Sequence, residues 1–154
     1  MKKIAVYLDN CCFNRPYDDQ TQVKVSLDAQ AKMYVQRLIV EKRLDFVYSF
    51  ISVYENNDNP FYNRKKAVSD FFENATCYDP KVHKDFIDAK ANEIMKTGIK
   101  EKDAIHVACA IYGKADIFLT TDKRLLKFQT DEIAIMNPID FVRNLEELLW
   151  EVLL

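Results

Sequence analysis

The chain has 154 residues, of which 49% are hydrophobic and 30% charged, and its formal net charge is −2. This composition is typical of a globular protein with a substantial core and excludes the disordered and fibrous classes. The mild negative charge argues against a large non-specific nucleic-acid surface, although a local basic rim around an acidic site fits it. Since the chain has only 2 Gly and 4 Pro and shows no repeat, we predict a single domain over residues 1–154.

No stretch of the sequence is long and apolar enough to cross a membrane. The charged start Met1-Lys2-Lys3 is followed by an apolar segment too short for a secretion signal, so we expect a cytoplasmic protein without a membrane partner. The cysteines form no C-x-x-C pair, being Cys11, Cys12, Cys77 and Cys109. We therefore expect reduced thiols and no structural zinc site.

The first half of the chain begins with a short apolar run, Lys3–Leu8, that stops at Asp9. Such a run predicts a central strand of a parallel sheet. Residues 11–22 are polar and predict a loop. Residues 23–42, with Leu27, Ala31, Tyr34, Val35 and Leu38 at helical spacing, predict an amphipathic helix, and residues 44–51 predict a second strand.

Asparagine or aspartate stands before proline at Asn59-Pro60, Asp79-Pro80 and Asn137-Pro138. Side chains of this kind cap helix starts, and proline suits the first helical position. Helices are therefore expected to begin near residues 60, 80 and 138. Residues 74–78, between the first two of these starts, predict a short third strand.

Residues 100–112 are apolar on nearly every side and predict a buried helix, which Gly113 ends. Residues 116–121 predict a fourth strand that stops at Asp122. The remaining predicted elements are a short helix over 123–128, a last strand over 133–136 and a closing helix with an apolar stripe from 141 to 149. Strands that alternate with helices indicate an α/β fold with a mostly parallel sheet.

Four carboxylates stand where this fold brings strand ends together. Asp9 and Asp122 end the first and fourth strands, Glu55 follows the second strand, and Asp103 lies in the first turn of the buried helix. Carboxylates in one cleft repel each other unless a cation neutralises them. Oxygen ligands suit Mg²⁺ or Mn²⁺, which lower the pKa of a bound water and stabilise charge on a phosphate. The pattern indicates metal-assisted hydrolysis of a phosphodiester.

Four segments resemble the successive motifs of the PIN domain family, and they are Tyr7-Leu8-Asp9-Asn10, Ser52-Val53-Tyr54-Glu55, Asp103-Ala104-Ile105-His106-Val107-Ala108 and Leu119-Thr120-Thr121-Asp122. The resemblance implies a single PIN-like domain with a mostly parallel sheet of about five strands flanked by helices. It implies a Mg²⁺- or Mn²⁺-dependent endoribonuclease, a hydrolase with RNA as substrate. It also implies the toxin of a VapBC-type toxin–antitoxin pair, with an antitoxin partner and a homodimer.

Carried over to this chain, the family's catalytic and metal-binding acids correspond to Asp9, Glu55, Asp103 and Asp122. Family members often carry a further acid just after the last of these, where this chain has Lys123. The missing acid and the acidic composition support an alternative, a weakly active or inactive binding or regulatory module of the same fold. Phosphotransfer through Asp9 as nucleophile is disfavoured, since no second acid stands two residues later.

Each acid also has an ordinary structural interpretation. Asp122 could cap the helix that follows it, and the helix dipole alone favours Asp103 and Glu55 near helix starts. Asp9 is harder to explain in this way, because a buried carboxylate must be hydrogen-bonded or metal-bound. We expect His106 to be packed or hydrogen-bonded rather than a catalytic base.

Further candidates for contact with substrate or with metal-bound water are Asn10, Arg15, Ser52 and Thr120. An arginine fork beside a metal site could hold a phosphate, and Tyr17 nearby could stack on an unpaired base. The alternatives are a solvated loop for Arg15 and satisfaction of strand-end backbone groups for Ser52 and Thr120.

The end of the chain, Leu148–Leu154 with Trp150, is more apolar than a free terminus needs. The excess favours a self-association or partner surface. The alternative is a last helix folded wholly onto its own domain.

Overall fold

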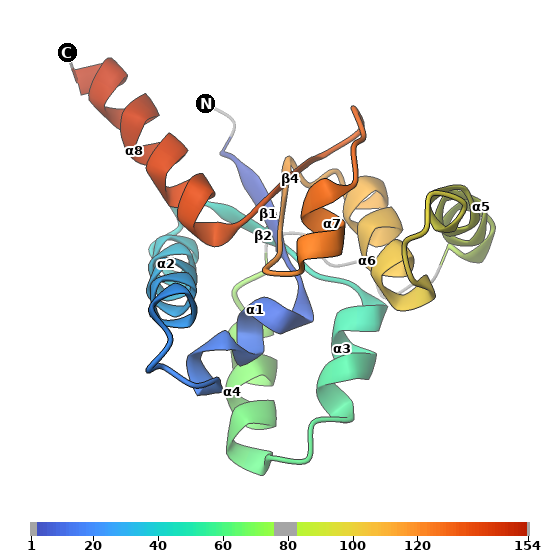
Figure 1. Ribbon diagram of the computed structural model, residues 1–154, viewed down its shortest axis with the longest axis horizontal. Coiled ribbons are helices and arrows are strands. Elements are labelled where there is room, and N and C mark those ends of the chain that lie inside the picture. Colours follow the sequence, from blue (N-terminus) through green and yellow to red (C-terminus); the bar gives the residue numbers. More distant parts are fainter. Residues whose placement is uncertain (1–2, 76–82, 154) are drawn as a thin grey trace.

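The computed structural model describes residues 3–75 and 83–153, and the side chains of Arg15 and of residues 146–153 lie outside the description. At its centre is a parallel sheet in the order β2-β1-β3-β4 (Figure 1). The strands are β1 (Ala5–Leu8), β2 (Asp45–Val47), β3 (Ile117–Leu119) and β4 (Ala134–Met136). The expected α/β class and parallel sheet are confirmed.

The expectation of five strands is wrong for the described residues, which form four. The third strand was predicted over residues 74–78, most of which lie outside the description. Its first residue, Asn74, does not extend into a strand, because its backbone N–H donates to the carbonyl of Phe71 (3.0 Å) and closes the preceding helix.

The helices of the described residues are α1 (Asn10–Asn14), α2 (Val23–Val40), α3 (Phe50–Asn57), α4 (Tyr62–Phe72), α5 (Lys84–Met95), α6 (Glu101–Tyr112), α7 (Lys123–Lys127) and α8 (Pro138–Leu153). The predicted loop over 11–22 is wrong in part, because α1 and a 3-10 turn at Arg15–Tyr17 occupy its first half. Phe13 is buried against Phe46 and Phe72, so the apolar residue in this polar stretch anchors the turn.

Alternate residues of β1 face opposite sides of the sheet, as the strand geometry requires. Ala5 and Tyr7 pack with Phe118 against α5 and α6, whereas Val6 and Leu8 pack with residues of α1, α2, α4 and α8. The sheet is therefore covered on both faces (Figure 1), which is the usual state of a parallel sheet. The carboxyl ends of its strands point toward α1 and α3.

The second predicted strand ends earlier than expected, at Val47. Ser49 precedes α3, and its backbone N–H donates to Oγ of Ser52 (3.3 Å) in a capping-box arrangement. The apolar run therefore continues across a helix start, with Phe50 and Ile51 already in α3. This start places Glu55 in the second turn of the helix.

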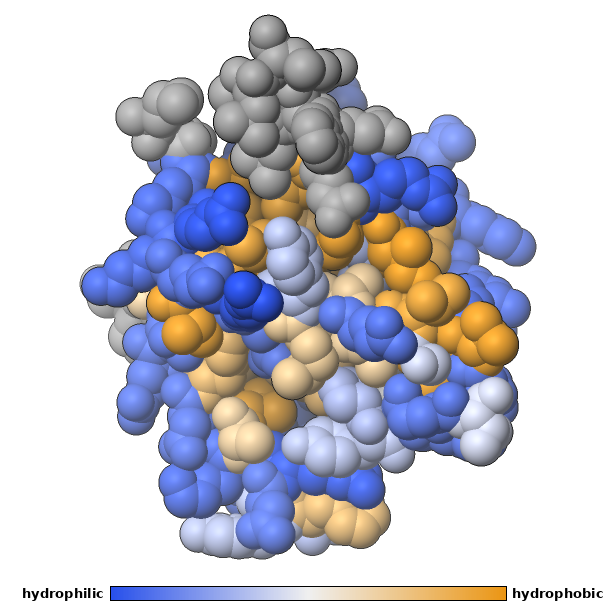
Figure 2. Space-filling model, turned by 90° about the vertical axis from the view of Figure 1, so that its left-hand side faces the viewer, coloured by the Kyte–Doolittle hydropathy of each residue, from blue (hydrophilic) through white to orange (hydrophobic). Residues whose placement is uncertain are grey.

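Helix α2 packs on α8, where Phe141 lies in one cluster with Val35 and Leu38. Leu27, expected on the buried stripe of α2, is 47% exposed, and Asp28 is buried instead. Further exposed apolar residues of α2 are Val23, Met33 and Val40, and Figure 2 shows this side of the molecule with apolar patches among hydrophilic side chains.

The expected association surface of Trp150 and the last three residues lies outside the described side chains, so the homodimer stays a prediction. Among the helices that the structure describes, none is long and apolar enough to span a membrane.

Candidate functional site

Asp9 and Asp122 follow the two central strands at the same edge of the sheet. Strands β1 and β3 pair in parallel with Leu8 beside Leu119, and the backbone N–H of Asp9 continues the ladder to the carbonyl of Leu119 (3.0 Å). In the order β2-β1-β3-β4, the chain adds β2 on one side of β1 and β3 on the other. The strand order therefore reverses between β1 and β3, and open α/β sheets bind ligands at such a point.

Thr120 links these two aspartates. Its buried hydroxyl donates to Oδ2 of Asp9 (2.9 Å) and accepts the backbone N–H of Asp122 (3.0 Å). Oδ1 of Asp9 accepts the backbone N–H of Asn10 (2.8 Å), and Cys11 Sγ lies 3.3 Å from Oδ2. Asp9 is only 5% exposed, so these bonds fix its orientation. Thr120 satisfies the strand-end backbone N–H of Asp122, as its structural alternative predicted, and its bond to Asp9 was not foreseen from the sequence.

Asp103 stands in the first turn of α6 and is half-buried. Burial, the largest cause, and the negative charges of Asp9, Asp122 and Glu55 together raise the pKa of its carboxyl from the usual 3.8 to about 6, against a lowering effect of His106. The four acids therefore act on one another through space. No hydrogen bond or ion pair joins Asp103 to any residue that the structure describes.

Glu55 is held from α3 toward α6 by His106. Nε2 of His106 lies 3.0 Å from Oε1 of Glu55, which is an ion pair when the ring is protonated, and Nε2 makes no hydrogen bond to a described residue. Nδ1 is 2.7 Å from the hydroxyl of Tyr7. Burial works to lower the pKa of His106, but Glu55 and the neighbouring aspartates outweigh it and raise the pKa above its usual 6.5. His106 is thus buried and partnered, as predicted.

Tyr7 anchors this network behind the carboxylates. Its hydroxyl lies 2.7 Å from Ser49 Oγ and 3.0 Å from Ser52 Oγ. Burial raises the pKa of Tyr7 well above its ordinary value, so the hydroxyl keeps its proton. Ser52, a sequence candidate for contact with water or phosphate, is 5% exposed and faces Tyr7.

Asp122 also caps the following helix, as its structural alternative predicted. Oδ1 accepts the backbone N–H groups of Arg124 (2.8 Å) and Leu125 (3.4 Å). A carboxylate has about four acceptor positions, so capping leaves others for a ligand. The backbone of Arg15 lies in the 3-10 turn after α1, and its side chain is outside the description.

The donor set of the site consists of carboxylate oxygens, which match the preference of Mg²⁺ and Mn²⁺. A divalent cation would also relieve the repulsion seen at Asp103. As the side chains stand, however, no three acidic, histidine or cysteine side chains in the described part are gathered so as to hold an ion. The chemistry of these residues therefore fits the ion. The acidic side chains would have to rotate to enclose it.

A cavity of about 310 Å³ adjoins the acids and is lined by Glu55, Asn10, Phe61 and Arg64 among others. Sequence reasoning missed Phe61 and Arg64. The signal that could have found them is the turn at Asn59-Pro60, which is followed by the aromatic pair Phe61-Tyr62 and then by Arg64.

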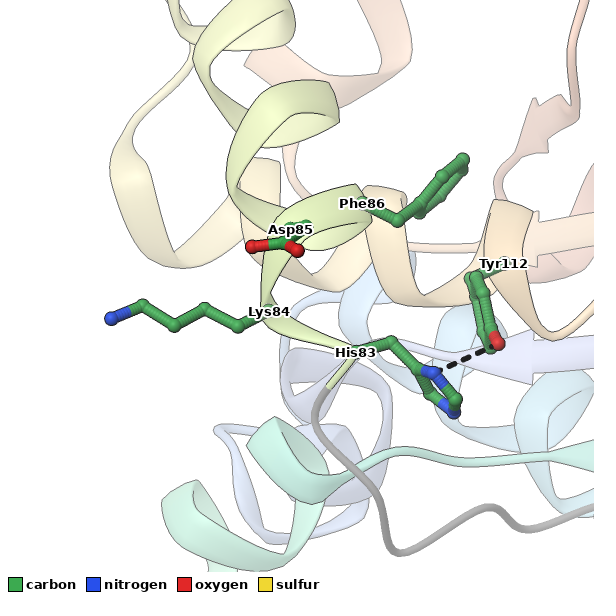
Figure 3. Close-up of a pocket in the computed structure, with 5 residues that line it drawn as sticks. All are labelled: His83, Lys84, Asp85, Phe86 and Tyr112. Atoms are coloured by element: carbon green, nitrogen blue, oxygen red, sulfur yellow. Dashed lines mark hydrogen bonds between the residues drawn. The ribbon is translucent and has the colours of Figure 1, made fainter.

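Another cavity, of about 340 Å³, lies where the end of α6 meets the start of α5 (Figure 3). Tyr112 and His83 meet there, with Oη and Nδ1 2.9 Å apart. Asp103 and Tyr112 stand at opposite ends of α6, about 13 Å apart along its axis. This cavity is therefore separate from the four carboxylates.

The chain shares its fold with two solved toxin–antitoxin structures. VapBC2 from Rickettsia felis, bound to a DNA fragment from its promoter, matches with 12% identity over 87% of this chain and 98% of that chain, at a TM-score of 0.54. FitAcB from Neisseria gonorrhoeae matches with 19% identity over 86% of this chain and 97% of that chain, at a TM-score of 0.50. No family model and no curated protein sequence matches the chain.

These comparisons correct the assignment to the PIN domain family. No model of any family matches, and the structural neighbours are toxin–antitoxin complexes at 12% and 19% identity, a level at which the fold alone is shared. The four quoted segments are short, and strand ends with an acid recur in many α/β folds. They do not establish membership of that family.

Proposed function

We propose that this chain is a Mg²⁺- or Mn²⁺-dependent endoribonuclease that works in a toxin–antitoxin pair. The observation that carries the proposal is that Thr120 joins Asp9 and Asp122 at the ends of two paired strands, with Asp103 close enough for their charges to help raise its pKa. Such a concentration of negative charge costs stability, and functional sites are where it is usually found.

Asp9, Glu55, Asp103 and Asp122 would hold the ion, which when bound lowers the pKa of a water and offsets charge on the scissile phosphate. The chain's own groups orient these acids. Thr120 and the backbone of Asn10 hold Asp9, and His106 holds Glu55 near α6. At neutral pH Asp103 is ionised and lacks a described hydrogen-bond donor, so its carboxylate is available to a cation.

Calorimetry with Mn²⁺ and cleavage of a labelled RNA test this proposal on wild type, Asp9→Asn and Asp88→Asn. Asp88 is an exposed acid of α5 and serves as the matched control. We expect Asp9→Asn to lose tight Mn²⁺ binding and at least about a hundredfold in cleavage rate, while Asp88→Asn behaves as wild type. Equal cleavage by Asp9→Asn would refute the site.

The toxin–antitoxin part of the proposal is supported by the shared fold. If it is right, expression of the wild type in a bacterial host arrests growth, and Asp9→Asn abolishes the arrest whereas Asp88→Asn does not. Normal growth with a protein that cleaves RNA in vitro would retain the nuclease and remove the toxin–antitoxin role.

A second candidate is a binding module without catalysis. The hydrogen bonds of Asp9 and Asp122 to protein donors favour it, because these two acids are satisfied without a metal. Wild type that binds no Mn²⁺, even with RNA present, would decide for this candidate.

A further inference from the structure

We propose that the cavity beside the carboxylates is a subsite for one nucleotide of single-stranded RNA, whose phosphate contacts Arg64 and whose base stacks on Phe61. This inference rests on the proposed function, since it places the substrate beside the scissile bond. Glu55 and Asn10, the neighbour of Asp9, line the cavity, so it lies beside the acidic site.

Arg64 is fixed in place yet keeps its hydrogen-bonding capacity. Its guanidinium carbon lies 4.4 Å from the ring centroid of Tyr17 and 4.0 Å from that of Phe61, a geometry in which the ring faces attract the cation. Within the described part of the chain its five N–H donors meet no acceptor. A pre-positioned guanidinium with unpaired donors is well suited to a phosphate.

Phe61 is 54% exposed although it lines a cavity. Exposure of a phenyl ring is unfavourable in water, and stacking with an unpaired base removes that exposure. In a duplex the bases are stacked on each other, so this platform selects single strands.

Asn10 adds a group that can read a base edge. Its carboxamide makes no hydrogen bond to any described side chain or backbone group, while its backbone N–H holds Asp9. An amide offers both donors and acceptors, and Asn10 lines the cavity directly after Asp9 in the chain. The cavity therefore combines a cation, an aromatic face and a free amide, which together match a nucleotide, while its lining also contains the carboxylates of Asp18, Glu55 and Asp58.

The experiment is a fluorescence-anisotropy titration of a labelled single-stranded RNA in buffer with Ca²⁺, with a gel afterwards to show that the RNA is intact. We compare Phe61→Ala and Arg64→Ala with two controls from the same helix region. Tyr62, 72% exposed, does not line the cavity, and Lys66 pairs with Asp70 (2.9 Å). Melting temperatures check that all four variants fold.

We expect Phe61→Ala and Arg64→Ala each to weaken binding at least about fivefold, and Tyr62→Ala and Lys66→Ala less than twofold. The same strand annealed to its complement should bind more weakly. Unchanged binding by Phe61→Ala, or equal affinity for the duplex, would overturn the subsite.

The two proposals fail in different ways. If the wild type cleaves RNA and Phe61→Ala binds and cleaves like it, the subsite is wrong and the nuclease stands. If the wild type binds RNA through Phe61 and Arg64 but cleaves none with Mg²⁺ or Mn²⁺, the subsite stands and the nuclease is wrong.

Discussion

The hydroxyl of Thr120 donates to Oδ2 of Asp9 at 2.9 Å and accepts the backbone N–H of Asp122 at 3.0 Å. One side chain thus holds the acids at the ends of two neighbouring strands in register. Substitution Thr120→Val keeps the shape and removes both bonds. Because the orientation of ligands depends on such supports, we expect Mn²⁺ affinity to fall about tenfold or more, measured by calorimetry.

Thr121→Val is the matched control for this prediction. The hydroxyl of Thr121 contacts no polar group among the described residues, so its loss should leave Mn²⁺ affinity unchanged. A similar loss in both variants would mean that the effect comes from the strand end and not from the bond to Asp9.

Asp103 gives the protein a particular dependence of stability on pH. Its pKa is about 6 in the folded chain and 3.8 ordinarily, so the folded state binds the proton more tightly. The free energy of unfolding therefore falls as pH rises from about 4 to about 6. Asp103→Asn should raise the melting temperature at pH 7.5 by about 2–4 °C, or about 1 kcal/mol after allowance for solvent screening.

The same substitution should have little effect at pH 4, where the carboxyl of the wild type is protonated and resembles an amide. Calorimetric melts of wild type and Asp103→Asn across this range are the measurement. If the two curves stay parallel from pH 4 to pH 7.5, the pKa of Asp103 is not raised in the folded chain.

The contact between Glu55 and His106 can be followed by NMR, because the chain has only two histidines. Burial works to lower the pKa of His106, and Glu55 is the largest of the causes that raise it. Glu55→Gln should therefore lower the pKa of His106. Since a raised histidine pKa stabilises the fold below pH 6.5 and this stability is lost as pH rises through the folded pKa, the variant should also lose that stabilisation.

Glu93→Gln, an exposed acid of α5, is the control for the histidine titration and should leave it unchanged. A His106 signal that titrates identically in wild type and Glu55→Gln would show that the two side chains do not meet in solution.

Some of the site could be predicted from the sequence because its acids directly follow unambiguous apolar runs. Asp9 and Asp122 stand at strand ends as expected, and their meeting follows from parallel pairing alone. Glu55 was placed less well, because Phe50 and Ile51 extend the apolar pattern of β2 across the cap at Ser49. A local pattern does not show where a strand stops and a helix begins when both are apolar.

Other features depend on contacts between distant segments. Arg64 meets Tyr17 only because α4 folds back beside the turn that follows α1, and no local pattern contains that approach.

The starts of helices are also only partly predictable from local sequence. Asn137 caps α8 at Pro138 as predicted, with Oδ1 accepting the N–H of Ile139 (2.7 Å), whereas Asn59 caps a turn and α4 begins at Tyr62.

Gly113 ends α6 as predicted, but the structure gives a different reason for a glycine there. Its φ of −75° suits any residue, whereas an added Cβ would lie 2.8 Å from Cγ1 of Val47 and 3.3 Å from the carbonyl oxygen of Cys109. Gly113→Ala should therefore destabilise the fold by about 1–3 kcal/mol through overpacking, measured by urea unfolding. Val47→Ala removes the obstructing methyl group, so the double variant should be more stable than the sum of the two single effects predicts. Strictly additive effects would place the cost in the backbone and not in the contact with β2.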